Sequence, residues 1–427
     1  MNHVTPEGGR LSHDVTNLSK RAIWAISLGT GLSLLGDSAL YTVLPTHTAQ
    51  AGVLLTAVGV LLSANRFIRL FSNNALGWLC DRWPRRRLFV PALFLGAIST
   101  AFYAFTVGFW PMLAGRLLWG IAWSGIWVTG NAIIFDISDD NNRGRWVGIY
   151  QISFFSGAAM GALSGGVLTD WLGFHGAMTA AAGFNLVGAL IAWVLLPETS
   201  RRTEAVGLQM PSVNGAWWRG KWSRLQELLA GFRQRPQLMS AVGLLSVNRI
   251  VIAGMFISTV SVLIASLLGN SVMVDGRTIG VSSITGAVLA VNTLFSVIFT
   301  PTFGAVSDRL GSRWRVAVWG LAAGVIGFGL LWRASPWFFL LAFPLTAVAS
   351  SSNQGLSTAL VGDFSAEVER GRILGVMFTM GDMGSALGPP LAFAILPIWG
   401  ISAVYGVCTL LFLLMFFTAA YWRRIEV

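Results

Sequence analysis

The chain has 427 residues, of which 54% are hydrophobic and only 11% are charged. A soluble globular protein carries about a quarter charged residues, so this composition excludes an ordinary soluble enzyme. The formal net charge is +11, and the placement of the cationic residues decides what that charge means.

Long apolar segments follow one another from residue 23 to residue 421 with short polar breaks between them. Because a helix needs about 20 apolar residues to cross a bilayer, we predict an all-α membrane protein with twelve spanning helices. Residues 1–22 contain no apolar stretch ahead of a cleavage site, so no removable signal peptide is expected. The expected spans are 23–45, 53–76, 88–107, 110–134, 146–169, 175–196, 239–266, 282–306, 315–333, 336–360, 373–395 and 399–421.

Nearly all lysine and arginine residues outside these spans fall on one side of the membrane, whereas Arg277 and Arg333 fall on the other. The positive-inside rule therefore predicts that both termini are cytoplasmic. Cations at the cytoplasmic leaflet are attracted to anionic lipid, so the charge reflects membrane topology, and no nucleic-acid partner is expected. We predict a multi-pass, monomeric protein of the plasma membrane, here the inner membrane of a bacterium.

The two halves of the chain repeat each other with a constant offset of 227 residues, which pairs Asn65 with Asn292 and Asp136 with Asp363. Repeated six-helix units, with the substrate path between them, are a known transporter design. The predicted organisation is a cytoplasmic tail 1–22, an N-terminal six-helix bundle 23–196, a cytoplasmic linker 197–238 with an amphipathic helix, a C-terminal six-helix bundle 239–422 and a cytoplasmic tail 423–427.

The loop after the second span reads Gly77-Trp-Leu-Cys-Asp81-Arg82-Trp-Pro84-Arg85-Arg86-Arg87, and its repeat reads Gly304-Ala-Val-Ser-Asp308-Arg309-Leu-Gly311-Ser-Arg313. Both resemble motif A of the major facilitator superfamily, although Pro84 replaces the usual glycine in the first copy. We expect Gly77 and Gly304 to allow close helix approach, and Arg85 and Arg87 to determine topology. The resemblance implies the fold of that family and a cytoplasmic latch made by Gly77, Asp81, Arg82, Arg86, Asp136, Gly304, Asp308, Arg309, Arg313 and Asp363.

Two further segments are similar to motifs of the same family. Arg116-Leu-Leu-Trp-Gly120 looks like motif B, and the glycine run that begins at Gly157 looks like the antiporter motif C, with Ala162 in place of its proline. Glycine at every fourth position is equally explained by close packing of two membrane helices. The residues expected in this packing are Gly157, Gly161, Gly165, Gly166, Gly384, Gly388 and Pro389.

Six charged residues stand out within the predicted spans, away from their limits, where a charge costs at least about 2.5 kcal/mol and is a functional candidate by default. The segment from Gly36 to Pro45, which contains Asp37, resembles the first helix of the drug-proton antiporter branch of the family. We therefore expect proton coupling by Asp37, Asp382 and Arg116. The alternative is a set of buried ion pairs, for example Asp37 with Arg66. The expected substrate-cavity residues are Tyr41, Asn65, Arg66, Arg69, Arg249 and Asn292.

The sequence contains no phosphate-binding loop of the ATPase type, so an ion gradient, most simply of protons, is the expected energy source. The four histidines show no metal-ligand spacing, and we expect no metal and no cofactor. The leading hypothesis is a secondary transporter, not an enzyme, that exports drug-like or metabolite molecules in exchange for protons. Uptake of a small organic anion is the alternative, and a non-transporting receptor with the same fold is the third hypothesis.

Overall fold

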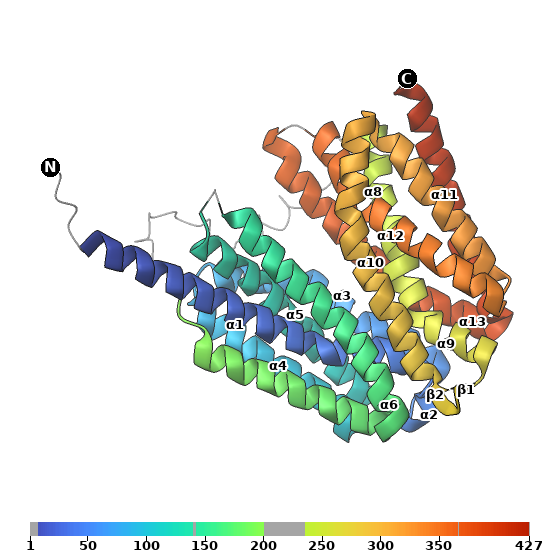
Figure 1. Cartoon of the computed structure of the whole chain (residues 1–427), viewed down its shortest axis with the longest axis horizontal. Helices are drawn as coiled ribbons and strands as arrows, with labels where there is room; N and C mark the ends of the chain where they lie inside the picture. Colours follow the sequence, from blue (N-terminus) through green and yellow to red (C-terminus); the bar gives the residue numbers. More distant parts are fainter. Residues whose placement is uncertain (1–6, 140–141, 200–234, 366, 427) are drawn as a thin grey trace, which may run out of the picture.

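The computed structural model describes residues 7–139, 142–199, 235–365 and 367–426, and these are almost entirely helical. Figure 1 shows two groups of helices, one from each half of the chain. The N-terminal group contains α1 (Glu7–Val43), the short α2 (Thr48–Ala51), α3 (Leu55–Cys80), α4 (Arg85–Phe105), α5 (Phe109–Ile137) and α6 (Arg143–Leu195).

The second group begins with one long helical stretch made of α8 (Pro236–Asn248), a π-helical segment η1 (Arg249–Phe256) and α9 (Ile257–Leu268). An antiparallel hairpin follows, in which Val272 pairs with Ile279. The sequence predicts no strands there. The remaining elements are β1 (Ser271–Val274), β2 (Arg277–Gly280), α10 (Val281–Leu310), α11 (Arg313–Trp332), α12 (Pro336–Phe364) and α13 (Glu367–Ile425). Residues 200–234 lie outside the described residues, so the surface helix expected in the linker stays a prediction.

Two of these helices turn at a single glycine. Gly173 in α6 has φ 72° and Gly400 in α13 has φ 77°, a left-handed conformation that glycine adopts without steric cost. Figure 1 shows α6 turning back on itself at its lower end. The two glycines are 227 residues apart, as the repeat requires, and each lies at or beside an expected gap between spans.

Nine helices in the described part of the chain are long and apolar enough to cross a membrane. The bent helices α6 and α13 each count once among them, and α12 is not included. Its polar run from Ser350 to Gln354 lowers its hydropathy. The total of twelve spans and the cytoplasmic location of both termini therefore stay predictions.

The hydrophobic core shows where the two halves meet. One core cluster, which includes Phe89, Trp119 and Ile126, lies wholly within the N-terminal half. The other joins the halves, because it packs Leu61 of α3 with Phe256 of η1 and the rest of the C-terminal core. The N-terminal residues of this joint cluster come from the ends of the helices that lie nearest the β-hairpin.

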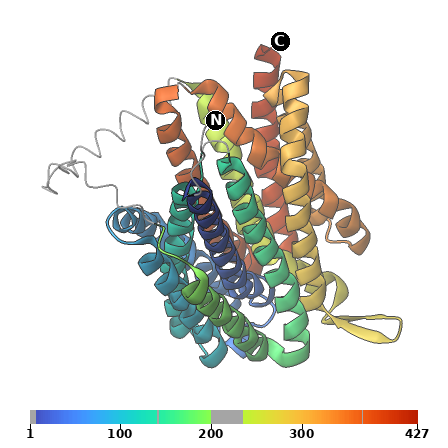
Figure 2. The same cartoon turned by 60° about the vertical axis from the view of Figure 1, so that its left-hand side comes forward.

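The close backbone contacts between the halves lie at the same end. A β-carbon at Gly166 of α6 would collide with the carbonyl of Ser282 in α10, and one at Gly59 of α3 would lie 2.8 Å from the carbonyl of Pro389. In addition, Asp170 accepts a hydrogen bond of 2.8 Å from the backbone N–H of Ser283, at the start of α10. Figures 1 and 2 show the helices converging toward the hairpin, with the start of α1 and the end of α13 away from it.

Candidate transport site

The N-terminal half contains a buried ion pair between α1 and α5. Arg116 is fully buried, and its Nη1 lies 2.5 Å from Oδ1 of Asp37, whose side chain is 16% exposed. The guanidinium also donates from Nε to the carbonyl of Leu61 at 3.0 Å and from Nη2 to the hydroxyl of Tyr41 at 3.1 Å. A buried arginine is tolerated when its charge is paired and its donors are satisfied, and both conditions are met here.

Tyr41 and Asn65 complete this cluster. The Tyr41 hydroxyl donates to the carbonyl of Leu62 at 2.6 Å and lies 3.4 Å from Oδ1 of Asn65. The ring of Tyr41 also lies beneath the guanidinium of Arg116, with 5.1 Å from Cζ to the ring centroid, within the range of a cation–π interaction. The predicted cavity residue Tyr41 thus contacts the predicted proton-coupling residue Arg116, and Asn65 contacts Tyr41.

The suggested pair of Asp37 with Arg66 is wrong, because Asp37 is held by Arg116. Arg66 instead reaches across to the C-terminal half and donates from Nη1 to the carbonyls of Ala253 at 2.9 Å and Ser385 at 2.5 Å. Ala253 belongs to η1, and a π-helix shifts its internal hydrogen bonds by one residue relative to an α-helix. The carbonyl of Ala253 is therefore available to a side chain from the other half.

A second ion pair joins the halves directly. Arg69 of α3 donates from Nη2 to Oδ2 of Asp382 in α13 at 3.0 Å, and the two side chains are 20% and 30% exposed. The buried Nε of Arg69 has no hydrogen-bond partner in the described part of the chain. Asp382, the other predicted proton carrier, is thus engaged at the interface between the halves.

Arg249 is the first residue of η1 and lies beside this second pair. It is half-buried, and it interacts electrostatically with Asp382, Arg66 and Arg69. Among the residues that the structure describes, its side chain makes no hydrogen bond or ion pair. The predicted cavity residue Asn292 is buried in α10, and its Nδ2 has no partner within those same residues.

The predicted packing residues lie at close helix contacts, most of them within one half and two of them between the halves. A β-carbon at Gly157 would collide with Gly31 of α1, and one at Gly161 would lie 2.8 Å from the Cα of Leu35. In the C-terminal half, a β-carbon at Gly388 would collide with Gly254 of η1. Close helix packing is therefore a sufficient explanation of these residues. The others in the predicted set are placed likewise, with Gly165 against Ala39, Gly384 against Ser246 and Ile250, Gly166 against α10, and Pro389 against Gly59.

The second set of predicted latch residues is assembled. Arg313 pairs with Asp308 through Nη1 and with Asp363 through Nε, the latter at 3.0 Å. Arg309 follows Asp308 at the end of α10 and makes no hydrogen bond or ion pair within the described residues. Arg313 is the first residue of α11, so one side chain ties the ends of three helices together.

In the first set the expected arginine is wrong by one residue. Asp136 is paired with Nε of Arg85 at 3.0 Å, whereas Arg86 donates to the carbonyl of Trp193 at 2.6 Å. Pro84 causes this shift, because it ends the turn between α3 and α4 early and makes Arg85 the first residue of α4. In the second half Gly311, with φ 63°, lengthens the turn by one residue.

The other predicted latch residues of the N-terminal half do not join the pair of Arg85 and Asp136. Asp81 makes no side-chain hydrogen bond or ion pair within the described residues. Arg82 lies over the ring of Trp78, with 4.0 Å from Cζ to the centroid. The expected close approach at Gly77 and Gly304 is absent from the described structure, because a β-carbon at either would meet no atom within 4 Å.

Two features escaped the sequence interpretation. Glu198 accepts hydrogen bonds from the backbone N–H groups of Arg85 and Arg86 at the start of α4, where helix amides lack internal partners. An aromatic cluster places Trp127 of α5 in a stack on Trp123 and Tyr150, with centroids 5.7 Å apart in both pairs. The acidic residue after the sixth span and the tryptophans four apart in α5 were the available signals.

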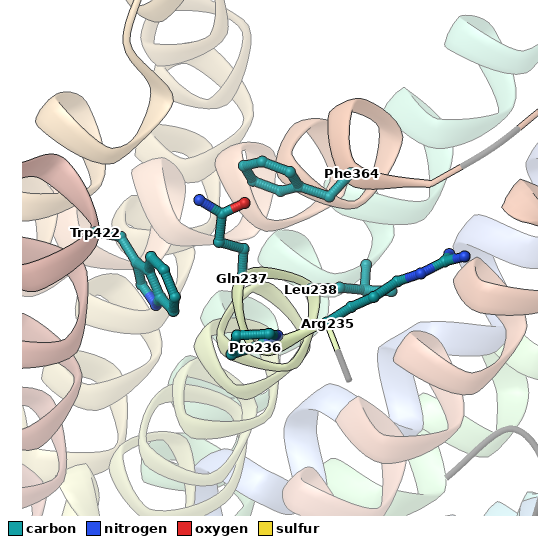
Figure 3. Close-up of a pocket in the computed structure, with 6 residues that line it drawn as sticks. All are labelled: Arg235, Pro236, Gln237, Leu238, Phe364 and Trp422. Atoms are coloured by element: carbon teal, nitrogen blue, oxygen red, sulfur yellow. The ribbon is translucent and has the colours of Figure 1, made fainter. Parts of the chain in front are cut away.

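A cavity of about 260 Å³ lies at the start of α8, beside the ends of α12 and α13. Figure 3 shows its lining residues, among which Gln237 lies between the rings of Trp422 and Phe364. Arg235 precedes Arg249 by fourteen residues, or about 20 Å of helix at 1.5 Å per residue. The cavity is therefore separate from the charged cluster. Within the described chain no group of three or more His, Cys, Asp or Glu residues is placed to hold a metal ion.

Comparison with known proteins gives a consistent result. The model of the Major Facilitator Superfamily matches the chain over residues 26–291 and 250–427. The class C tetracycline resistance protein of Escherichia coli is 27% identical over 340 residues, which cover 79% of each chain. The multidrug resistance protein MdtG of Salmonella arizonae is 22% identical over 394 residues, covering 91% of this chain and 92% of that one.

Among solved structures, a bacterial homologue of the human lysosomal transporter Spinster in an inward-facing, unoccupied conformation is similar with a TM-score of 0.71. Its identity is 16%, and the match covers 95% of this chain and 97% of that one. At this identity the likeness shows the fold alone. The family and its bacterial relatives confirm that the chain is a multi-pass transporter of the inner membrane and not an enzyme. The family model matches the chain from residue 26 to residue 427, and the chain therefore belongs to the Major Facilitator Superfamily.

Proposed function

We propose that this protein exports small organic molecules across the inner membrane in exchange for protons, with Asp37 as the proton carrier. The observation that carries the proposal is the buried pair of Asp37 with Arg116. An intramembrane carboxylate with one cationic partner is a functional candidate by its cost alone. The relatives named for tetracycline and multidrug resistance support export of organic molecules.

The described conformation fits one step of such a cycle. The halves share a core at the hairpin end, and Figure 1 shows them diverging toward the chain termini. If the termini are cytoplasmic, as the positive-inside rule predicts, the joined ends of the halves face the outside. In this arrangement Asp37 lies against Arg116, as it would after giving up its proton.

Protonation of Asp37 would change this cluster in a simple way. A neutral carboxyl group can still accept a hydrogen bond, but it no longer balances the charge of Arg116. Arg116 keeps the carbonyl of Leu61 and the hydroxyl of Tyr41 as acceptors. A proton gained from the outside and lost to the cytoplasm would then alternate the net charge of the cluster once per cycle. No cofactor is needed, because the proton gradient supplies the energy, and one chain contains both halves of the path.

The aromatic cluster of α5 and α6 supports organic substrates. Trp127 and Phe154 are only half-buried, and their ring centroids lie 5.4 Å apart. Trp127 follows Arg116 by eleven residues, about 16 Å along the helix. Flat apolar faces of this kind bind ring-containing molecules by stacking.

The test is Asp37→Asn in proteoliposomes with an imposed pH gradient. The substrate is whichever of tetracycline, ethidium and benzoate the wild-type protein accumulates under that gradient. We expect gradient-driven accumulation to fall at least about tenfold, while exchange without a gradient persists, because an amide cannot release a proton at ordinary pH.

The matched control is Asp275→Asn, at the exposed tip of the hairpin. Asp275 has φ 48°, and asparagine tolerates that conformation, so the variant should accumulate substrate as the wild type does. Normal gradient-driven accumulation by Asp37→Asn would refute Asp37 as the proton carrier.

The latch is proposed as a second part of the same mechanism. Arg85 with Asp136, and Arg313 with Asp308 and Asp363, hold helix ends together within each half. Asp81 has no such partner in the described conformation, and it would gain one if the ends of the two halves near the termini came together.

Uptake of a small organic anion is the second candidate function. Arg249 favours it, because its side chain makes no ion pair among the described residues and such an arginine is suited to an anionic substrate. The direction of accumulation under an imposed gradient distinguishes the two candidates. Antiport moves substrate against the proton flow, whereas symport moves it with the flow.

A further inference from the structure

We infer that Arg249, together with Arg69, forms a subsite for the acidic group of the transported molecule, a carboxylate or a phosphate monoester. The inference rests on the proposed function in one respect, namely that the substrate path runs between the halves. It specifies the substrate class that the charges at that interface would accept.

The charge balance at the interface is the first argument. Arg66, Arg69 and Arg249 lie within electrostatic reach of one another, and Asp382 is the acid among them. Three cations and one carboxylate leave a net charge of +2 between the halves. Such an excess inside a membrane protein is costly, and an anionic ligand would reduce it.

The second argument is the set of hydrogen bonds that each arginine makes. Arg116 is committed to Asp37, Arg66 to two backbone carbonyls, and Arg69 to Asp382. The side chain of Arg249 makes no hydrogen bond or ion pair among the described residues, and its guanidinium has five N–H donors. It is therefore the arginine of this group best able to bind a carboxylate or phosphate through paired hydrogen bonds.

The local structure places Arg249 where both halves can take part. It is the first residue of the π-helical segment η1, and such segments occur frequently at functional sites. Its side chain runs along α13, because a β-carbon at Gly381 would lie 3.4 Å from Cγ of Arg249. Gly381 precedes Asp382, so Arg249 borders the Arg69–Asp382 pair.

Arg69 would supply the second arm of the subsite from the opposite half. Its buried Nε has no partner in the described part of the chain, while its Nη2 is held by Asp382. An anion bound to both arginines would contact α3 and η1 at once. A ligand that touches both halves can be bound differently as they move, which alternating access requires.

The experiment measures binding to the full chain in lipid nanodiscs. The probes are benzoate and phenyl phosphate, with benzamide as the neutral analogue of the same shape as benzoate. We expect at least one of the two anions to bind at least about tenfold more tightly than benzamide. Whether benzoate or phenyl phosphate binds more tightly assigns the acidic group as carboxylate or phosphate.

Variants then locate the subsite. Arg249→Gln should weaken anion binding at least about tenfold, and Arg249→Lys should keep part of it, because lysine retains the charge but not the fork of donors. The control is Arg277→Gln, an exposed arginine of the β-hairpin, which should bind the anions as the wild type does. Circular dichroism and size-exclusion chromatography establish that each variant is folded.

A second measurement needs no substrate. Phenylglyoxal modifies arginines that are not engaged in ion pairs, and mass spectrometry should find Arg249 modified faster than Arg116. The anion that binds should slow modification of Arg249, and benzamide should not. Equal binding of both anions and benzamide, or unchanged anion binding in Arg249→Gln, would overturn the subsite.

The anion subsite and the proton carrier can be accepted or rejected independently of each other. Asp37→Asn should keep the preference for the anions over benzamide, because Arg249 and Arg69 are unchanged, while it loses gradient-driven accumulation. Intact proton coupling with no anion preference would reject the subsite alone. An anion preference that depends on Arg249, without an effect of Asp37→Asn on coupling, would reject the proton carrier alone.

Discussion

The molecule contains two intramembrane pairs of aspartate and arginine that differ in where they are anchored. Asp37 and Arg116 both belong to the N-terminal half, whereas Arg69 and Asp382 come from opposite halves. Rigid movement of the halves against each other would leave the first pair within one half and would separate the second. The same two residue types can therefore serve proton exchange in one place and conformational change in the other.

The two pairs also differ in how deeply they are buried. Arg116 is fully enclosed, but the side chains of Arg69 and Asp382 retain 20% and 30% exposure. Arg116 also has backbone and hydroxyl acceptors, which would hold it in place when Asp37 is neutral. A contact that movement of the halves would separate should be weaker than one that such movement leaves in place, and the surroundings of the two pairs agree with that requirement.

The largest effect on stability is expected for Arg116→Gln. Removing one partner of a buried pair leaves the other charge uncompensated, which costs about 3–5 kcal/mol. Arg69→Gln removes a partly exposed pair and should cost about 1 kcal/mol or less. Thermal unfolding of the purified variants measures both losses, and equal losses would remove the distinction between the two pairs.

Charge reversal sharpens the same comparison at the level of transport. Arg69→Asp alone places two carboxylates together and should slow transport at least about tenfold. The double variant Arg69→Asp with Asp382→Arg should recover to within about threefold of the wild-type rate, because the pair needs mainly opposite charge. The corresponding exchange of Asp37 with Arg116 should not recover, since the acceptors around Arg116 suit only a guanidinium. Recovery there would contradict the difference.

A smaller effect is expected where helices pack within the C-terminal half. Gly388→Ala forces α13 away from the backbone of Gly254 in η1, which should cost about 1–3 kcal/mol by overpacking. Gly375→Ala on the same helix is the matched control, because a β-carbon there meets no atom within 4 Å. Equal unfolding midpoints for the two variants would show that this close contact is not required.

The smallest effect concerns the helix ends of the N-terminal half. Arg85→Gln breaks the pair with Asp136 and should lower stability by about 1 kcal/mol or less, as for other partly exposed pairs. Arg86→Gln leaves that pair in place and should lower it less. A double-mutant cycle with Asp136→Asn measures the coupling of each arginine, and a larger coupling for Arg86 would favour the original assignment from the motif.

Much of the fold could be predicted from the sequence, because a lipid environment demands long apolar helices whose limits are visible in the residues. The offset of 227 residues also predicts structure at single positions, as Gly173 and Gly400 show. The β-hairpin was missed because its strands are only four residues long and lie within an expected loop.

The residues of the candidate site could be predicted from the sequence, but the partner of each residue could not. Asp37, Arg66 and Arg116 were all identified, yet the sequence cannot specify how each helix is rotated toward its neighbours. Arg66 faces η1, and a π-helical segment has no sequence signal that would reveal its accessible carbonyl. The shift from Arg86 to Arg85 was marked by Pro84, but its effect on the turn required the backbone conformation.

The single-glycine joints at Gly173 and Gly400 have a practical consequence for mapping how the chain is inserted into the membrane. An epitope or reporter sequence placed at either joint would find no loop to occupy and would have to unwind the adjoining helices. Exposed loop tips accept insertions far better, and the hairpin turn at Asp275 and Gly276 is such a tip. A reporter for the membrane face opposite the termini therefore belongs in the hairpin.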